Sequence, residues 1–168
     1  MKAIGIGEAQ KATSPNSVTL VCTKKPNGET NLATISWWTY LSNKPAMLGV
    51  ALSDKGYSGE LIRENKQFAL CIPGEAIAEG AFRCGTVSGR SVDKAAAFVI
   101  EMRSLPGATV QTPVHSKLVF FCVLESAHQA GDHTFYICRV DNIMYDDTQK
   151  QLYAWEGYGS LLPLHARQ

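Results

Sequence analysis

The sequence lacks several features that mark common classes of protein. Its formal net charge is only +1, so no strong overall field attracts it to nucleic acid or to an anionic membrane surface. No apolar run approaches the roughly 20 residues that span a bilayer. The first residues, Met-Lys-Ala-Ile-Gly-Ile-Gly-Glu, show neither the apolar stretch nor the cleavage pattern of a signal peptide. We therefore expect no nucleic-acid partner and no membrane association.

Cysteine is present, but not at the spacing of a metal site or a disulfide framework. The five cysteines are odd in number, widely separated and without a Cys-x-x-Cys pair: Cys22, Cys71, Cys84, Cys122 and Cys138. Four have apolar neighbours, which is typical of buried, reduced thiols. The pattern argues against zinc and against disulfides, and it favours a reducing compartment, the cytoplasm.

Familiar catalytic signatures are also missing. The sequence contains no Gly-x-Gly-x-x-Gly dinucleotide fingerprint, no Gly-x-Ser-x-Gly elbow and no His-x-x-x-His metal pair. It offers no obvious nucleophile, acid–base pair or metal of its own. A protein with a ligand-shaped surface and no such machinery often borrows a cofactor.

What the sequence does contain is one domain, residues 1–168, that is rich in strands. Its 45% apolar and 18% charged residues fit a packed globule. β-branched content and alternation predict strands at 17–23, 31–37, 46–53, 67–72, 117–127, 133–145 and 151–155. Shorter helices are expected at 57–65, 75–84 and from Asp93, with a helical or loop segment at 39–43 and a loose tail after 155. The order predicts a mainly β fold, a closed or nearly closed β-barrel with short inserted helices.

The strand expected at 31–37 has an unusual face. The amide of Asn31 and the hydroxyls of Thr34 and Ser36 lie in a strand where Ala33 leaves room. Such a surface would offer hydrogen bonds to a flat ligand with polar edges. An ordinary edge strand with its hydroxyls toward water is the simpler alternative.

Two later segments suit a phosphate group. The helix expected at 57–65 would have Ser58 as its N-cap, and a helix start offers free N–H groups and the positive end of the dipole. The segment from Cys84 to Lys94 combines two glycines, three hydroxyls and two cations, a composition that suits a phosphate or a sugar chain. A solvated loop would explain the same composition, and most serine N-caps bind nothing else.

Four segments, taken together, resemble the flavin reductase-like proteins with an FMN-binding split barrel, in particular the flavoredoxin branch. They are residues 31–37, 51–62, 84–94 and 131–133, and they occur in the family's order. The run Cys-Gly-Thr-Val-Ser-Gly-Arg-Ser-Val-Asp-Lys at 84–94 is the most specific. The tail after Trp155 fits the family's Gly-x-x-Tyr close only loosely, and the Pro-Tyr-Pro-like lead is missing.

The resemblance implies a six-stranded, Greek-key-like split barrel, a homodimer, and non-covalent FMN at the dimer edge. It implies that the isoalloxazine edge meets Asn31, Ala33, Thr34 and Ser36. The isoalloxazine ring and the ribityl chain would be lined by Ala51, Leu52 and Ser53. The ribityl and phosphate groups would be held by Tyr57, Ser58, Ser88, Arg90 and Lys94, in a cradle that includes Cys84 and Gly85. His133 would lie by the flavin and help to bind a pyridine nucleotide, with a purely structural histidine as the alternative.

Three functions stay open on this basis. The first, which we expect, is an FMN-dependent oxidoreductase that takes hydride from NAD(P)H and reduces free flavin, a ferric chelate or a small acceptor. The second is a flavoredoxin-type carrier that exchanges electrons with a protein such as a ferredoxin. The third is a flavin-binding or structural barrel without turnover. We expect Cys84 to end a helix and to shape the cradle rather than to react, because a helix C-terminus disfavours the thiolate.

Overall fold

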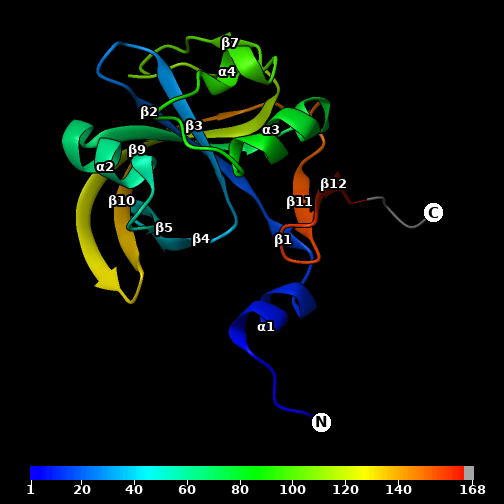
Figure 1. Ribbon diagram of the computed structural model, residues 1–168. Helices are drawn as coiled ribbons and strands as arrows, with labels where there is room; N and C mark the ends of the chain where they lie inside the picture. Colours follow the sequence, from blue (N-terminus) through cyan, green and yellow to red (C-terminus); the bar gives the residue numbers. More distant parts are fainter. Residues whose placement is uncertain (165–168) are drawn as a thin grey trace.

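The computed structural model describes residues 1–164 and is built on one antiparallel sheet of seven strands in the order β3-β2-β6-β9-β10-β5-β4. These strands are β2 (Thr19–Lys24), β3 (Thr30–Ile35), β4 (Trp38–Asn43), β5 (Ala46–Ser53), β6 (Gln67–Pro73), β9 (Ser116–Ala130) and β10 (His133–Tyr145). The long strands β9 and β10 curve around one side of the body (Figure 1). In the described part of the chain no ladder joins the edge strands β3 and β4, so the barrel is split rather than closed.

Smaller elements surround this sheet. A three-stranded sheet contains β1 (Asn16–Ser17), β11 (Leu152–Trp155) and β12 (Ser160–Pro163), and a ribbon pairs β7 (Met102–Arg103) with β8 (Thr112–Pro113). The helices are α1 (Ile6–Ala12), α2 (Tyr57–Asn65), α3 (Ala78–Cys84) and α4 (Lys94–Ala97), with a 3-10 turn, η1, at Glu75–Ile77. Helix α1 projects away from the body (Figure 1). None of the helices in residues 1–164 is long and apolar enough to cross a membrane.

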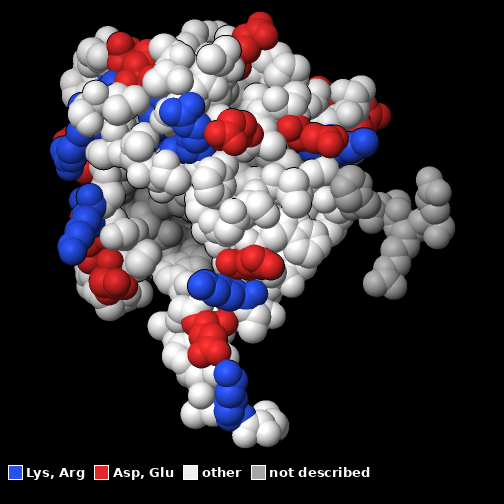
Figure 2. All heavy atoms as spheres, turned by 45° about the vertical axis from the view of Figure 1, so that its right-hand side comes forward, with Lys and Arg blue, Asp and Glu red and all other residues white. Residues whose placement is uncertain are grey.

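The sheet buries both of its faces, which explains why its central strands are apolar throughout. In β9, Val119 and Phe121 pack into a cluster with α3, β11 and β12, whereas Phe120 and Cys122 pack into a second cluster with β5 and α2. Successive side chains of a strand point to opposite faces, so one strand serves both cores. Figure 2 shows Lys and Arg interspersed with Asp and Glu on the outer surface, and a hollow above the projecting N-terminal segment.

Several sequence-based expectations need correction. Residues 39–43 are not helical or loop but belong to β4, which adds a seventh strand to the six that the resemblance implied. Its backbone pairs with β5 from Trp38↔Val50 to Asn43↔Ala46, and such pairing overrides weak local propensity. The expected loose tail instead forms β12, which pairs with β11.

The start of α2 also differs from expectation. Its N-cap is Gly56, without a side-chain cap, so the prediction of Ser58 as N-cap is wrong. Ser58 lies in the first turn, where it is buried and its Oγ accepts a hydrogen bond from Asn31 Nδ2 at 2.9 Å. The serine therefore joins the helix to β3 instead of closing the helix end.

Candidate functional site

A cleft follows the split in the barrel, between β3, β5, α2 and the loop that leads from α3 to α4. Two adjoining cavities, of about 270 and 240 Å³, share the wall residues Thr34, Ile35, Leu52 and Ser53. A third cavity of about 150 Å³ continues from the second toward the base of α1. Together they fall within the range of roughly 300–1,000 Å³ that is typical of small-molecule sites.

The structure brings every site residue expected from the sequence to this cleft except Arg90. The larger cavity is lined by Asn31, Ala33, Thr34, Leu52, Ser53, Tyr57, Ser58, Cys84, Gly85, Ser88 and Lys94. The second cavity adds Ser36, Ala51 and His133. Segments that lie more than a hundred residues apart in sequence thus form one continuous wall.

Asn31 is the most informative residue of the larger cavity. Its side chain is 3% exposed, and Nδ2 donates hydrogen bonds to Thr23 Oγ1 at 3.0 Å and to Ser58 Oγ at 2.9 Å. Its Oδ1 is buried without a hydrogen-bond partner among the described residues. A buried acceptor without a donor costs free energy. The cavity wall therefore contains an unmet acceptor beneath Gly89 of the covering loop, which a ligand hydroxyl or N–H group would satisfy if the loop gave it access.

The loop over this cavity approaches so closely that it requires glycine. A Cβ atom on Gly89 would overlap Asn31 Oδ1, and one on Gly85 would overlap the Tyr158 hydroxyl. These two glycines therefore let the backbone pack against Asn31 of β3 and against Tyr158 of the β11–β12 turn. The glycine content of the 84–94 motif is explained by this close packing.

Lys94 is buried beneath the same loop. Asp93 caps α4, because its Oδ1 accepts from the backbone N–H groups of Ala95 and Ala96. Lys94 Nζ is held at 2.7 Å from each of two carbonyl oxygens, those of Leu32 and Cys84. Burial lowers the pKa of Lys94, and neighbouring Cys84 opposes this. An ammonium has three N–H groups, and the two carbonyl oxygens account for two of them in a residue that lines the cavity.

Arg90 lies beside the cleft rather than in its wall. Its guanidinium bonds the carboxylate of Glu60 and stands 4.6 Å from the centre of the Tyr57 ring. Besides Lys94, the cavity wall contains Lys55, which lies directly before the N-cap of α2. Sequence reasoning missed Lys55, although a lysine just ahead of a helix start was a readable signal. The role of Arg90 in holding phosphate stays a prediction.

The second cavity is bounded by an aromatic pair. His133 is the first residue of β10 and lies opposite Ser53 of β5. Its Nδ1 is 2.7 Å from Asp132 Oδ1, and its ring centre is 4.7 Å from that of Trp37. The hydrogen bond with His133 lowers the pKa of Asp132. Trp37 is 44% exposed; the sequence offered it either as a surface for a partner subunit or as a core residue, and did not place it at the flavin.

Two acidic groups in the wall are held in their neutral forms. Burial raises the pKa of Cys84 to about 11, although Lys94 acts in the opposite direction. Burial likewise raises the pKa of Tyr158 to about 12, and its hydroxyl donates to the carbonyl of Phe82 at 2.9 Å. Cys84 is the last residue of α3, as expected. Tyr158 was missed, because only the tertiary fold brings the β11–β12 turn to the cleft.

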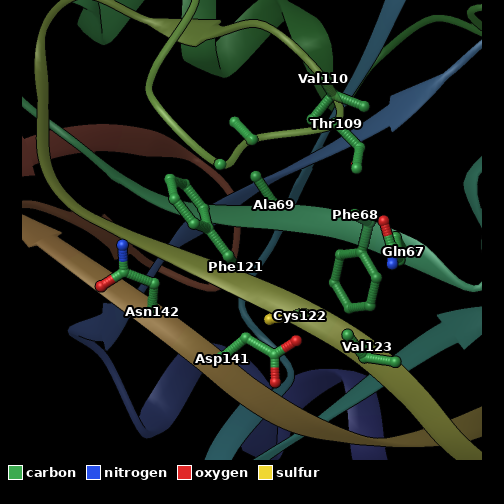
Figure 3. Close-up of a pocket in the computed structure, with 12 residues that line it drawn as sticks. Gln67, Phe68, Ala69, Thr109, Val110, Phe121, Cys122, Val123, Asp141 and Asn142 are labelled. Atoms are coloured by element: carbon green, nitrogen blue, oxygen red, sulfur yellow. The ribbon is translucent and has the colours of Figure 1, made fainter.

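A separate groove of about 240 Å³ crosses the middle strands β6, β9 and β10. Figure 3 shows Phe68 and Phe121 from neighbouring strands, the loop residues Thr109 and Val110 on one side, and Asp141 on the other. None of the site residues expected from the sequence lines it. In residues 1–164 no group of three or more His, Cys, Asp and Glu side chains is placed to hold a metal ion.

The comparisons with known proteins agree with this geometry. An uncharacterised protein of Archaeoglobus fulgidus is 24% identical over 120 residues, which cover 71% of this chain and 68% of the relative. The flavoredoxin of Methanosarcina acetivorans has a similar fold, with a TM-score of 0.83 and 21% identity over 100% of this chain and 94% of the other. An NADH:FAD oxidoreductase of Streptomyces globisporus gives a TM-score of 0.84 at 12% identity over 99% of both chains. A family model described as "Flavin reductase like domain" matches residues 12–162, and the chain therefore belongs to the flavin reductase-like family.

Proposed function

We propose that this protein is an FMN-dependent oxidoreductase that takes hydride from NAD(P)H and reduces free flavin, a ferric chelate or a small acceptor. Membership of the family supports a flavin-related oxidoreductase as its class. The observation that carries a bound flavin is the buried, unpartnered Oδ1 of Asn31 inside the cleft. A polyol chain such as the ribityl group supplies the hydroxyl donor that this atom lacks.

The residues of the larger cavity fit a phosphate as well. Helix α2 starts there with the uncapped N–H groups of its first turn, and Lys55 lies directly before it. A phosphate dianion is stabilised by a helix start and by cations. Lys94 adds a third N–H group that its two carbonyl partners do not use. We favour FMN over FAD because these groups suit a terminal phosphate; the Streptomyces neighbour, described as acting on FAD, makes FAD the alternative.

A flavin bound in this cleft would supply the hydride and electron transfer that the chain's own side chains do not. The residues of the chain would position the flavin and cover it. Loop 84–89 covers the larger cavity, and Trp37 and His133 bound the second cavity, where a planar donor or acceptor would stack. The Asp132 carboxylate fixes the orientation of the His133 ring.

The second candidate is a carrier that exchanges electrons with a protein such as a ferredoxin, favoured by the fold shared with a flavoredoxin. Stopped-flow mixing of the FMN-loaded protein with NADH or NADPH, without oxygen, separates the two. Rapid bleaching of the flavin absorbance supports the reductase. Bleaching only by reduced ferredoxin supports the carrier, and a protein that binds no flavin contradicts both.

We also propose a homodimer, located in the cytoplasm. Tyr40 is 62% exposed, Ile143 49% and Tyr145 64%. The Tyr40 ring lies 6.1 Å from that of Phe120, whose strand partner is Ile143, so Phe120 connects the exposed Tyr40 of edge strand β4 with the exposed Ile143 of β10, and Tyr145 lies two residues further along β10. Exposed apolar patches mark interfaces. Sedimentation should give a dimer at micromolar concentration, and a stable flavin-loaded monomer would contradict it.

The five free, buried cysteines support a reducing compartment.

A further inference from the structure

Asp54, which follows Ser53 of the second cavity, connects three segments through its carboxylate and its backbone. Its Oδ1 accepts a hydrogen bond from Thr134 Oγ1 at 2.6 Å, near the start of β10. Its Oδ2 accepts one from Gln129 Nε2 at 2.5 Å, near the end of β9. Its backbone N–H donates to the carbonyl of Asp132 at 3.1 Å. One residue of the β5–α2 connection thus binds both strands of the β9–β10 hairpin and its turn.

Gln129 extends this connection across the hairpin turn. The same Nε2 lies 2.8 Å from the carbonyl oxygen of Gly131 and 3.3 Å from that of His133. The amide therefore holds the backbone on either side of Asp132, whose carboxylate bonds the His133 ring. The order of the His133 side chain depends on a turn that Asp54 anchors through Gln129 and Thr134.

The neighbours of Asp54 connect this anchor to the cleft. Ser53, before it, lines both main cavities, and Lys55, after it, lines the larger one. His133 pairs with Ser53 in the β5–β10 ladder. The hydroxyl of Thr134, followed by the amide of Gln129, lowers the pKa of Asp54, so both hydrogen bonds are made to a carboxylate at neutral pH.

We propose that Asp54 is a positioning residue: through Thr134 and Gln129 it holds the His133 ring beside the tilted Trp37 ring, in the position that admits the electron donor. This inference rests on the proposed function, because it assigns the second cavity to the pyridine nucleotide. It predicts that loosening the anchor weakens use of the donor while the larger cavity still binds flavin. A one-ångström displacement of a positioning group lowers activity by up to about 100-fold, and we expect about tenfold here.

The test compares Thr134→Val with Thr134→Ser in the full-length protein. Valine has the shape of threonine but no hydroxyl, whereas serine keeps the donor to Asp54. For Thr134→Val we expect the KM for NAD(P)H to rise about tenfold, with kcat and the Kd for FMN within twofold of wild type. Thr134→Ser should restore the wild-type KM. Asp54→Ala, which removes both carboxylate acceptors, should behave like Thr134→Val.

A second measurement, made on the flavin-free protein, does not depend on the proposed activity. The ring protons of His133, shifted in NMR spectra by the Trp37 ring, should move in Thr134→Val and not in Thr134→Ser. Unchanged His133 signals in Thr134→Val overturn the proposal, as does a fall in FMN affinity parallel to the rise in KM. If wild type binds no flavin or ignores NAD(P)H, the proposed function fails, while the His133 signals still decide whether Asp54 positions the ring.

Discussion

The cleft along the split barrel and the groove across β6, β9 and β10 differ little in size, about 270 Å³ for the larger cavity of the cleft and 240 Å³ for the groove. Their polar groups differ. In the groove, Asp141 bonds Arg139, and Asn142 Oδ1 accepts from the Ile143 N–H at 2.8 Å. In the cleft, Asn31 Oδ1 has no partner in residues 1–164. The two hollows are therefore alike in volume, and the cleft differs from the groove in having a buried acceptor in its wall that lacks a donor.

The largest effect is expected from Gly89→Val, which tests the cleft directly. The new side chain would collide with Asn31 Oδ1, since even a Cβ overlaps it. Either the loop moves away from β3 or the cavity is filled. We expect FMN affinity, measured by fluorescence titration, to fall more than 100-fold, which corresponds to about 3 kcal/mol.

The matched control fills the groove instead. Thr109 is exposed on the loop that borders it, so Thr109→Phe can occupy the groove without entering the core. We expect FMN affinity within twofold of wild type. If Thr109→Phe abolishes binding and Gly89→Val does not, the groove is the flavin site.

The next effect is expected from Lys94→Met. The change removes an ammonium from the carbonyls of Leu32 and Cys84 and from the cavity. A hydrogen bond to a charged group contributes about 1.5–3 kcal/mol, so FMN affinity should fall by about 10- to 100-fold. Riboflavin affinity, measured in the same titration, should change less than threefold. Equal losses for both flavins would exclude the phosphate as the partner of Lys94.

Lys117→Met is the control for the lost lysine–carbonyl contact. Lys117 Nζ donates to the carbonyl of Gln149 at 2.9 Å, away from the cleft. Thermal unfolding should show destabilisation in both variants. Only Lys94→Met should lose FMN affinity; a similar loss in Lys117→Met would mean that stability, not position, controls binding.

A smaller effect is expected from lowering the pH, which protonates the carboxylates of Asp54 and Asp132. The pKa values of Asp54 and Asp132 are lowered, mainly by hydrogen bonds from Thr134 and His133 respectively. Carboxylates with depressed pKa values stabilise the fold above the unfolded value of 3.8, and this contribution is lost as the pH falls through the lower folded value. The protection factor of the Asp54 amide, which is the intrinsic exchange rate divided by the observed one, should therefore fall below pH 3.8 while that of the Phe121 amide beside the groove stays unchanged. Equal protection of both amides would contradict this.

The smallest effect is expected from Cys84→Ser, although Cys84 lines the cleft. Burial raises the pKa of its thiol to about 11, and the thiolate is the reactive form. FMN content and the rate of flavin reduction should stay within a few-fold of wild type, and native Cys84 should resist iodoacetamide at pH 8. A variant that keeps FMN but loses turnover would show that the thiol takes part in the chemistry.

Local signals in the sequence were sufficient for much of the fold. The helix at 57–65 and the strand at 46–53 have the expected bounds, because apolar periodicity and a nearby proline or glycine define each of them. Strand β4 was not recognisable, since its residues are mostly exposed and are held by pairing with β5. Pairing with a distant segment produces no recognisable pattern in the local sequence.

The sequence predicted which segments form the site, but not which contacts their individual side chains make. The motif at 84–94 does meet the strand at 31–37, yet Lys94 turns its ammonium to two carbonyls and Arg90 turns to Glu60. Composition shows which residues share a loop; it does not show which way a long side chain points. Trp37 and Tyr158 reach the cleft only through the tertiary fold.

The most direct test of the flavin assignment is a titration of the purified wild-type protein with FMN, with the bound flavin counted after denaturation. The unpaired acceptor of Asn31 and the start of α2 predict one FMN per chain at saturation, with quenched flavin fluorescence and a yellow protein. Gly89→Val should abolish the quenching, and Thr109→Phe should leave it unchanged. A colourless wild-type protein whose addition leaves the fluorescence of FMN unchanged would contradict the account.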